Sequence, residues 1–111
     1  TPDQAKKDAL KSDRAKLLFD GGDFAGAIAD YQKLLTTAPD NLDYLYWLGL
    51  ALISADANDK AKIQEGVNQL QAFVDKAPAT DTRREEVKGI VDEMKRSQNV
   101  TPQKPTRRRG N

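Results

Sequence analysis

Two pairs of neighbouring carboxylates are the residues of this chain that come closest to catalytic chemistry. Glu85-Glu86 and Asp92-Glu93 stand in one segment, and a pair of carboxylates can act as general acid and general base. The hydrophobic periodicity of that segment, however, predicts a short amphipathic helix with both pairs on its exposed side. A solvated helix face is where such residues usually lie, so we do not expect them to form a catalytic pair.

The chain has no histidine and no cysteine. This excludes an imidazole general base, a thiolate nucleophile, a disulfide and a zinc-thiolate site. The acidic residues between 56 and 59 lack the alternating ligands, the glycine and the terminal glutamate of a calcium-binding loop. The sequence also has no glycine-rich phosphate loop. We therefore expect a protein that is not an enzyme and that binds no metal and no cofactor.

The charges are unevenly distributed along the 111 residues, which suffice for one compact domain. Residues 98–111 carry four cations and no acid, and we expect them to form a basic, proline-containing disordered tail after a helical domain at 1–97. Such a tail suits an acidic partner, a nucleic acid, an anionic surface or another copy of the chain. Because no aromatic residue accompanies the arginines to stack on bases, nucleic-acid binding is disfavoured. The tail cations are Lys104, Arg107, Arg108 and Arg109.

Hydrophobic periodicity predicts an all-α fold of about five helices, and no segment alternates with the period of a strand. No stretch approaches the roughly 18 apolar residues of a membrane span. The expected helices cover about residues 3–20, 24–37, 42–54, 59–76 and 82–97.

Turn residues mark the ends of these helices. Gly21-Gly22 permits a left-handed end to the first helix, and Asp23 is expected to cap the second. Pro39-Asp40-Asn41 ends the second helix and caps the third. Thr82-Arg83-Arg84-Glu85 has the pattern of a capping box, which predicts that Thr82 caps the fifth helix.

Several motifs resemble the two halves of a tetratricopeptide repeat. Leu45-x-x-Leu48-Gly49-x-x-Leu52 is similar to the W-x2-L-G-x2-Y half, with large apolar residues in place of both aromatics. The A-x3-F…P half is resembled by Ala27-x-x-x-Tyr31 with Pro39, and again by Gly66-x-x-x-Leu70 with Pro78. The resemblance covers about residues 9–78. It implies a right-handed α-solenoid of antiparallel helix hairpins, with repeats at about 8–41 and 42–80 and a capping helix at 82–97.

The spacing of equivalent residues indicates an insertion in the second repeat. Ala15 and Gly49 lie 34 residues apart, the period of the family, whereas Ala27 and Gly66 lie 39 apart. Five extra residues must therefore lie between Leu52 and Gly66. We expect them in the polar run at 55–60, where they would lengthen the turn.

Small residues at the repeat positions are expected where two helices approach closely, because a larger side chain would wedge them apart. The residues expected to have purely structural roles are Ala15, Ala27, Tyr31, Pro39, Leu48, Gly49, Leu52, Gly66, Leu70 and Pro78.

The resemblance implies a non-catalytic interaction module, or adaptor, whose inner helices line a concave groove for a partner polypeptide. The residues expected to border this groove are Lys16, Phe19, Tyr46, Leu50 and Ile53. A second reading, which stays open, is that the fourth helix and the inserted turn cover these side chains. The alternative function is a structural subunit that self-associates end to end into an oligomer or filament, because two and a half repeats leave end faces to be covered.

The sequence leaves the compartment open. The chain begins at Thr1 rather than at methionine, which fits an N-terminal segment removed in processing as well as an excised domain. Absence of cysteine fits the cytoplasm and equally a periplasmic or secreted protein. Asn99-Val100-Thr101 is a formal glycosylation acceptor, and it has meaning only in a secreted context.

Overall fold

The computed structural model describes residues 2–100 and 102, and the cations of the expected basic tail lie outside this part of the chain. The described residues form five α-helices and no strand, which confirms the predicted all-α class. The helices are α1 (Pro2–Asp20), α2 (Phe24–Thr37), α3 (Leu42–Ala55), α4 (Lys60–Lys76) and α5 (Arg83–Ser97).

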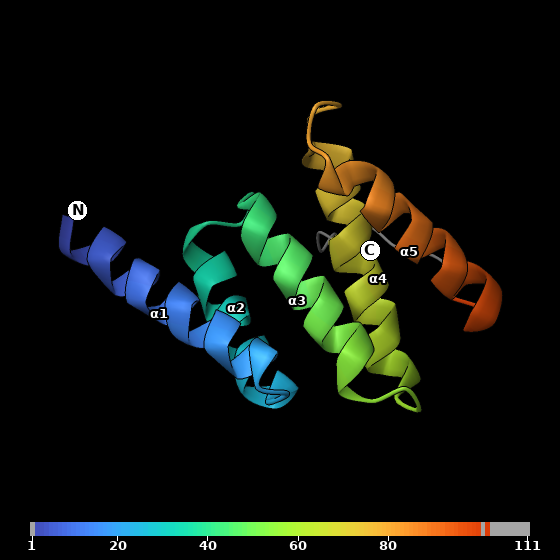
Figure 1. Cartoon of the computed structure of the whole chain (residues 1–111), viewed down its shortest axis with the longest axis horizontal. Coiled ribbons are helices and arrows are strands. Elements are labelled where there is room, and N and C mark those ends of the chain that lie inside the picture. Colours follow the sequence, from blue (N-terminus) through green and yellow to red (C-terminus); the bar gives the residue numbers. More distant parts are fainter. Residues whose placement is uncertain (1, 101, 103–111) are drawn as a thin grey trace, which may run out of the picture.

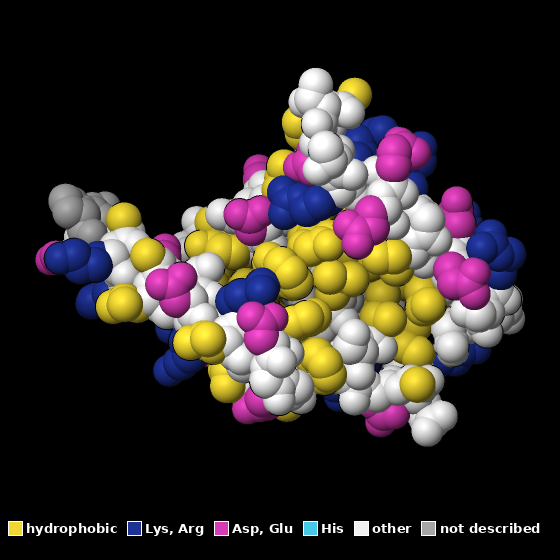
Figure 2. Space-filling view, viewed as in Figure 1, with side chains coloured by type: hydrophobic (Ala, Val, Ile, Leu, Met, Phe, Trp, Pro, Cys, Tyr) yellow, Lys and Arg dark blue, Asp and Glu magenta, His cyan; other side chains and the backbone are white. Residues whose placement is uncertain are grey.

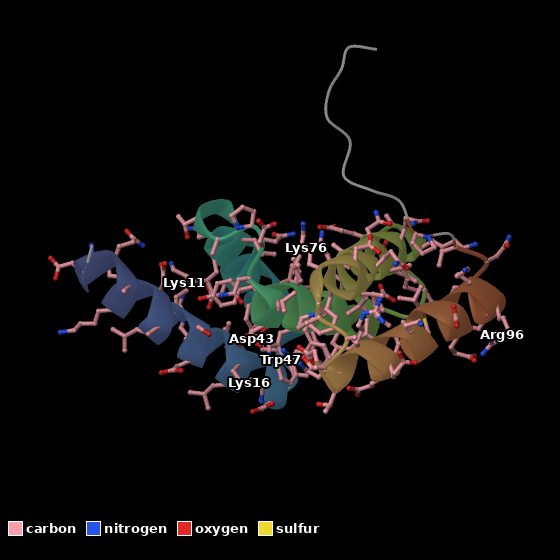
Figure 3. The ribbon with its side chains drawn as sticks, turned by 90° about the horizontal axis from the view of Figure 1, so that it is seen from above. Lys11, Lys16, Asp43, Trp47, Lys76 and Arg96 are labelled. Carbon is pink, nitrogen blue, oxygen red and sulfur yellow. The ribbon has the colours of Figure 1, made fainter. Side chains whose placement is uncertain are left out.

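Each helix packs on the next one along the chain, from α1 on α2 through to α4 on α5. Two layers result: α1, α3 and α5 lie in one layer, and α2 and α4 lie in the other (Figures 1 and 3). Because α3 packs on both α2 and α4, much of its surface is covered, and the helix is apolar over most of its circumference. The arrangement is an α-solenoid of antiparallel hairpins closed by α5.

The predicted end of α1 and the predicted N-terminal caps of α2 and α3 are confirmed. Gly22 has φ of +89°, a left-handed conformation that lets α1 end in a tight turn. The Asp23 carboxylate accepts a hydrogen bond from the Gly26 N–H (3.0 Å) at the start of α2. The Asn41 side chain accepts one from the Tyr44 N–H (3.1 Å) at the start of α3. These caps satisfy backbone donors that have no partner within the helix.

The predicted capping box of the fifth helix is wrong. Thr82 already has helical dihedral angles (φ −65°, ψ −23°) and makes no side-chain capping bond. The turn before α5 is closed one residue earlier, because the Asp81 N–H donates to the Pro78 carbonyl (2.9 Å). Asp81 then accepts the Arg83 N–H (2.9 Å), and this carboxylate takes the capping role that the spacing assigned to threonine.

The prediction that the five extra residues lengthen the turn is also mostly wrong. The turn between α3 and α4, at residues 56–59, is only one residue longer than the turn at 21–23. Most of the insertion is helical: α4 begins six residues before Gly66, whereas α2 begins three residues before Ala27. Asp59 caps this added turn by accepting the Lys62 N–H (3.1 Å). Ile63, 1% exposed, anchors it in the core.

The end of α5 is tied into the core by residues assigned from the sequence to the tail. Asn99 adopts φ of 56°, the left-handed conformation that reverses the chain after a helix. Val100 is then buried, 5% exposed, in the cluster formed by α3, α4 and α5. The helical domain of the described chain thus extends to Val100.

Candidate protein-binding surface

A continuous apolar surface lies over α3, in the layer that α3 shares with α1 and α5. Figure 2 shows it at the centre of this face, bordered by acidic and basic side chains. A contiguous apolar patch on the surface of a folded domain often marks an interaction site, whereas single exposed apolar residues are common. The half-buried apolar residues of the three helices that can form it are Phe19 on α1, Trp47, Leu50 and Ile53 on α3, and Ile90 and Met94 on α5.

The residues expected to border a groove fall into two groups. Lys16, Phe19 and Leu50 are half-buried and retain accessible surface. Ile53 is half-buried as well, but it leans on α4: a Cβ placed on Gly66 would lie 2.8 Å from Ile53 Cγ1. Tyr46 is buried, with 7% of its surface exposed. The reading in which neighbouring helices cover these side chains therefore describes Tyr46 and, in part, Ile53.

A series of aromatic rings makes this face rigid. Phe19 of α1 meets Trp47 of α3 edge to face, with ring centroids 5.2 Å apart, and meets Phe24 of α2 at 5.3 Å. Tyr46 continues the series, 4.8 Å from Trp47 and 5.6 Å from Phe73 of α4. The Phe19–Phe24, Phe19–Trp47 and Tyr46–Trp47 pairs are edge to face, and each such contact contributes about 0.5–1.5 kcal/mol beyond the area it buries. Four helices are thus held by one chain of rings.

Lys16 forms the border of the surface on the α1 side. Its ammonium lies 4.5 Å from the centroid of the Trp47 ring, close enough for a cation–π interaction. The same nitrogen is 3.1 Å from both carboxylate oxygens of Asp20. Figure 3 shows Lys16 and Trp47 next to each other on this side of the molecule. The charge of Lys16 is therefore already paired within the chain.

Arg83 forms the border at the opposite end of α3. Its guanidinium donates to Asp43 (2.8 Å) and to Asp81 (3.1 Å), and its central carbon lies 5.1 Å from the ring centroids of both Tyr46 and Phe73. The hydrogen bond to Asp81 is the main reason why the pKa of Arg83 is raised, and the same bond lowers the pKa of Asp81. Arg83 thus joins α3, α4 and α5 at one point.

The buried Tyr46 has a defined polar partner. Its hydroxyl donates a hydrogen bond to Glu86 Oε1 (3.1 Å). Burial, followed by the nearby charge of Glu86, raises the pKa of Tyr46, so the hydroxyl remains a donor at neutral pH. One member of the Glu85-Glu86 pair therefore has a structural partner, and both residues are exposed as predicted.

The repeat positions lie where the helices are closest. A Cβ added to Gly49 would lie 2.6 Å from Leu70 Cγ and 3.1 Å from the Gly66 carbonyl oxygen. One added to Gly66 would lie 2.9 Å from the Gly49 carbonyl oxygen. Neither position tolerates a side chain without a shift of α3 against α4. The buried repeat residues are Ala15, Ala27, Tyr31, Leu48, Gly49, Leu52, Gly66 and Leu70, whereas Pro39 and Pro78 are exposed in turns.

A pocket of about 390 Å³ lies on the other layer, between α2 and α4, and the sequence did not indicate it. Leu35, Leu45 and Leu48 are among its lining residues. The Lys76 ammonium and the Asp40 carboxylate pair across its rim (3.0 Å). In the sequence, the signal for this pocket would have been apolar Leu35 on one helix with polar residues on the facing side of the other. That pattern is also typical of an ordinary contact between two helices.

Residues 2–100 and 102 contain no group of three or more His, Cys, Asp or Glu side chains that could hold a metal ion. Over the same residues, no helix is long and apolar enough to cross a membrane.

The fold and the surface together define a helical repeat protein made of stacked antiparallel hairpins. A family model described as TPR repeat matches residues 15–54, from the second half of α1 to the end of α3. This match supports a tetratricopeptide repeat fold for the chain, and the five helices fit two such repeats followed by a capping helix. Repeats of this family generally mediate protein–protein interactions. No curated protein and no solved structure matches the chain significantly.

Proposed function

We propose that this protein is a non-catalytic adaptor that binds a partner polypeptide on the apolar surface formed by α1, α3 and α5. The observation that carries the proposal is the position of half-buried Phe19, Trp47 and Leu50 on the face that the aromatic series makes rigid. A rigid surface loses little conformational entropy when a partner binds. Apolar residues that are accessible on such a surface are the usual centre of a protein–protein contact.

The partner is expected to present apolar side chains to this surface. The charges that border it are already paired within the chain, Lys16 with Asp20 and Arg83 with Asp43. They therefore offer little net attraction for a charged ligand, and salt should change the affinity only weakly. Met94 on α5 is half-buried at the edge of the core, and it is expected to contact the partner from the side opposite Phe19.

The test compares substitutions on the two layers. A tagged chain is used to recover its partner from the native source, and the purified partner is then titrated against variants. Leu50→Glu and Met94→Glu are each expected to weaken binding at least about tenfold, because they place a charge in the apolar contact. Ala29→Glu makes a similar change on the exposed side of α2 and should bind as the parent does.

Circular dichroism establishes that each variant keeps the helicity of the parent. Equal affinity of folded Leu50→Glu, Met94→Glu and parent chains would show that the partner binds elsewhere, and the adaptor surface proposed here would have to be abandoned. A loss of binding in Ala29→Glu alone would move the contact to the layer of α2 and α4.

A further inference from the structure

The pocket between α2 and α4 combines an apolar floor with a polar rim. Leu45 and Leu48 of α3 line it and are 4% and 2% exposed. Leu35 of α2 adds a half-buried apolar wall. A ligand for such a pocket needs an apolar stem and a polar head. The polar residues of the lining are Gln32, Asp40, Glu65, Gln69 and Lys76.

One carboxylate of this rim has no cation beside it. Glu65 is half-buried, and within residues 2–100 and 102 it forms no ion pair. The hydrogen bond that it accepts from the Gln32 amide is long, 3.4 Å. Gln69 lies one helical turn further along α4, on the same side of the helix. Because water screens a half-buried carboxylate less than an exposed one, a cation placed between these residues would be attracted to Glu65.

The lysines nearest to the pocket do not supply that cation. The Lys76 ammonium is held by Asp40 at 3.0 Å, and the Lys62 ammonium lies 3.3 Å from Asp59 at the start of α4. Lys33 lies on the side of α2 that faces α1, where it adds to the effect of Arg14 on the pKa of Asp30. The charged residues of the lining, two acids and one base, therefore leave one negative charge unbalanced.

The C-terminal segment of the chain carries cations and can reach the pocket. Residues 103–111 contain four cations and no acid, whereas the rest of the chain has three more acidic than basic side chains. Val100 ties this segment to the cluster formed by α3, α4 and α5. Arg107 follows seven residues later, and seven residues span at most roughly 25 Å. A helix with its side chains is only about 10–12 Å across, so the segment is long enough to cross α4.

We propose that residues 103–111 bind the pocket between α2 and α4 of their own chain, with one arginine of the Arg107-Arg108-Arg109 run seated in it. The aliphatic stem of that arginine lies on Leu35, and its guanidinium donates to Glu65. Arginine suits the site better than lysine, because its planar head can donate to the carboxylate and to a glutamine amide oxygen at once. Since the segment is tethered, its effective concentration at the pocket is about millimolar, and a weak contact is sufficient.

This inference does not depend on the adaptor function. The pocket lies on the layer of α2 and α4, whereas the proposed partner surface lies over α3 on the other layer. The two also differ in their response to salt. The contact of the C-terminal segment pairs charges of opposite sign, so it should weaken as salt is added, whereas partner binding over α3 should change little.

Paramagnetic relaxation in the full chain tests where the segment lies. The chain has no cysteine, so Thr106→Cys gives a single site for a nitroxide spin label. At low salt, the label is expected to broaden the amide signals of residues 32–40 and 65–76, which border the pocket. The signals of α2 are the informative ones, because α2 lies on the far side of α4 from the α5 helix that precedes the segment.

Substitutions in the labelled chain separate the proposed contact from random approach of the segment. Glu65→Gln keeps the size of the side chain and removes its charge, and it should lower the paramagnetic relaxation rates in α2 about twofold or more. Arg107→Gln/Arg108→Gln/Arg109→Gln should lower them at least as much. Asp13→Asn removes one acid at an exposed site on α1 and should leave the rates unchanged. Circular dichroism verifies that helicity is the same in all of these variants.

Three results would overturn the proposal. The first is a parent chain in which the label does not broaden α2. The second is a folded Glu65→Gln variant with the same rates as the parent, because the segment would then approach α2 without the carboxylate. The third is broadening that arises between molecules, measured by mixing isotope-labelled chains without nitroxide and unlabelled chains that carry it. In that case the segment binds a second copy and not its own chain.

Discussion

At the scale of single residues, the same residue type has opposite roles in neighbouring helices. Gly66 is buried between α3 and α4, where a Cβ would lie 2.9 Å from a backbone carbonyl of the facing helix. Gly89 is exposed on α5 and has nothing within 4 Å of an added Cβ. Both glycines have ordinary helical backbone conformations, since the one positive φ among the described glycines is at Gly22. Only the surroundings distinguish them.

Alanine substitutions at these two glycines should therefore shift stability in opposite directions. Gly89→Ala is expected to raise the free energy of unfolding by about 0.5–1 kcal/mol, because alanine favours a helix and meets no obstacle. Gly66→Ala is expected to lower it by about 2 kcal/mol, because α3 and α4 must move apart. Urea denaturation of the two variants and the parent measures both changes. Equal shifts in the two variants would show that the close contact of α3 and α4 does not exist in solution.

At the scale of helices, the sequence predicted those features that depend on local chemistry. Asp23 and Asn41 were predicted to be caps because each precedes an apolar periodic segment, and a cap requires only a side chain and the next turn. Thr82 has the same local pattern, but Asp81, one residue earlier, accepts the Arg83 N–H instead. Similarly, the extra residues between Leu52 and Gly66 were evident from spacing, whereas their helical conformation depends on Ile63 reaching the core.

The candidate site was predicted less completely, because the exposure of its residues depends on contacts between helices that are distant in the sequence. Periodicity placed Tyr46, Leu50 and Ile53 on one side of α3, but it could not show which neighbour covers each of them. Tyr46 is buried because Glu86 of α5 accepts its hydroxyl and Arg83 lies over its ring. Such contacts join residues about forty positions apart in the chain, and single-sequence patterns contain no information on them.

The contacts that Arg83 makes between helices can be tested by substitution. Arg83→Ala is expected to lower the free energy of unfolding by about 1–2 kcal/mol, because two charge-assisted hydrogen bonds and two cation–π contacts are lost. Arg83→Lys should recover only part of this, since an ammonium cannot reproduce the fork of a guanidinium. Chemical denaturation measures both.

The neighbouring arginine is the control. Arg84 donates to the Val74 carbonyl at 3.3 Å and has only a distant carboxylate neighbour, so Arg84→Ala should change stability less. If Arg84→Ala proves as damaging as Arg83→Ala, the position of Arg83 between three helices is not what stabilises α5.

At the scale of the whole molecule, stability should be nearly independent of pH between about 4 and 10. The chain has no histidine. On the acid side, the hydrogen bonds from Arg14 lower the pKa of Asp30, which is 6% exposed. Its contribution to stability is present above the unfolded value of about 3.9 and is lost as pH falls further. Urea denaturation at a series of pH values should show this decrease.

On the alkaline side, burial raises the pKa of Tyr31 from 10.0 to about 12. Folding therefore favours the neutral phenol, and this contribution is present below pH 10 and is lost as pH rises to about 12. The loss corresponds to about 2–3 kcal/mol. Tyr31→Phe should remove the part of the alkaline decrease that belongs to this residue. An identical decrease in Tyr31→Phe would show that other groups cause it.

At the same scale, the apolar surface over α3 lies in the layer formed by α1, α3 and α5, and the charges at its border are paired within the chain. This surface therefore suits a partner that presents apolar side chains.

The most direct test of the adaptor function is hydrogen exchange of the chain with and without its purified partner. Binding over α3 predicts that the partner slows exchange in α1, α3 and α5 and leaves α2 and α4 unchanged. Slower exchange confined to α2 and α4 would contradict the account, because the partner would then occupy the opposite layer.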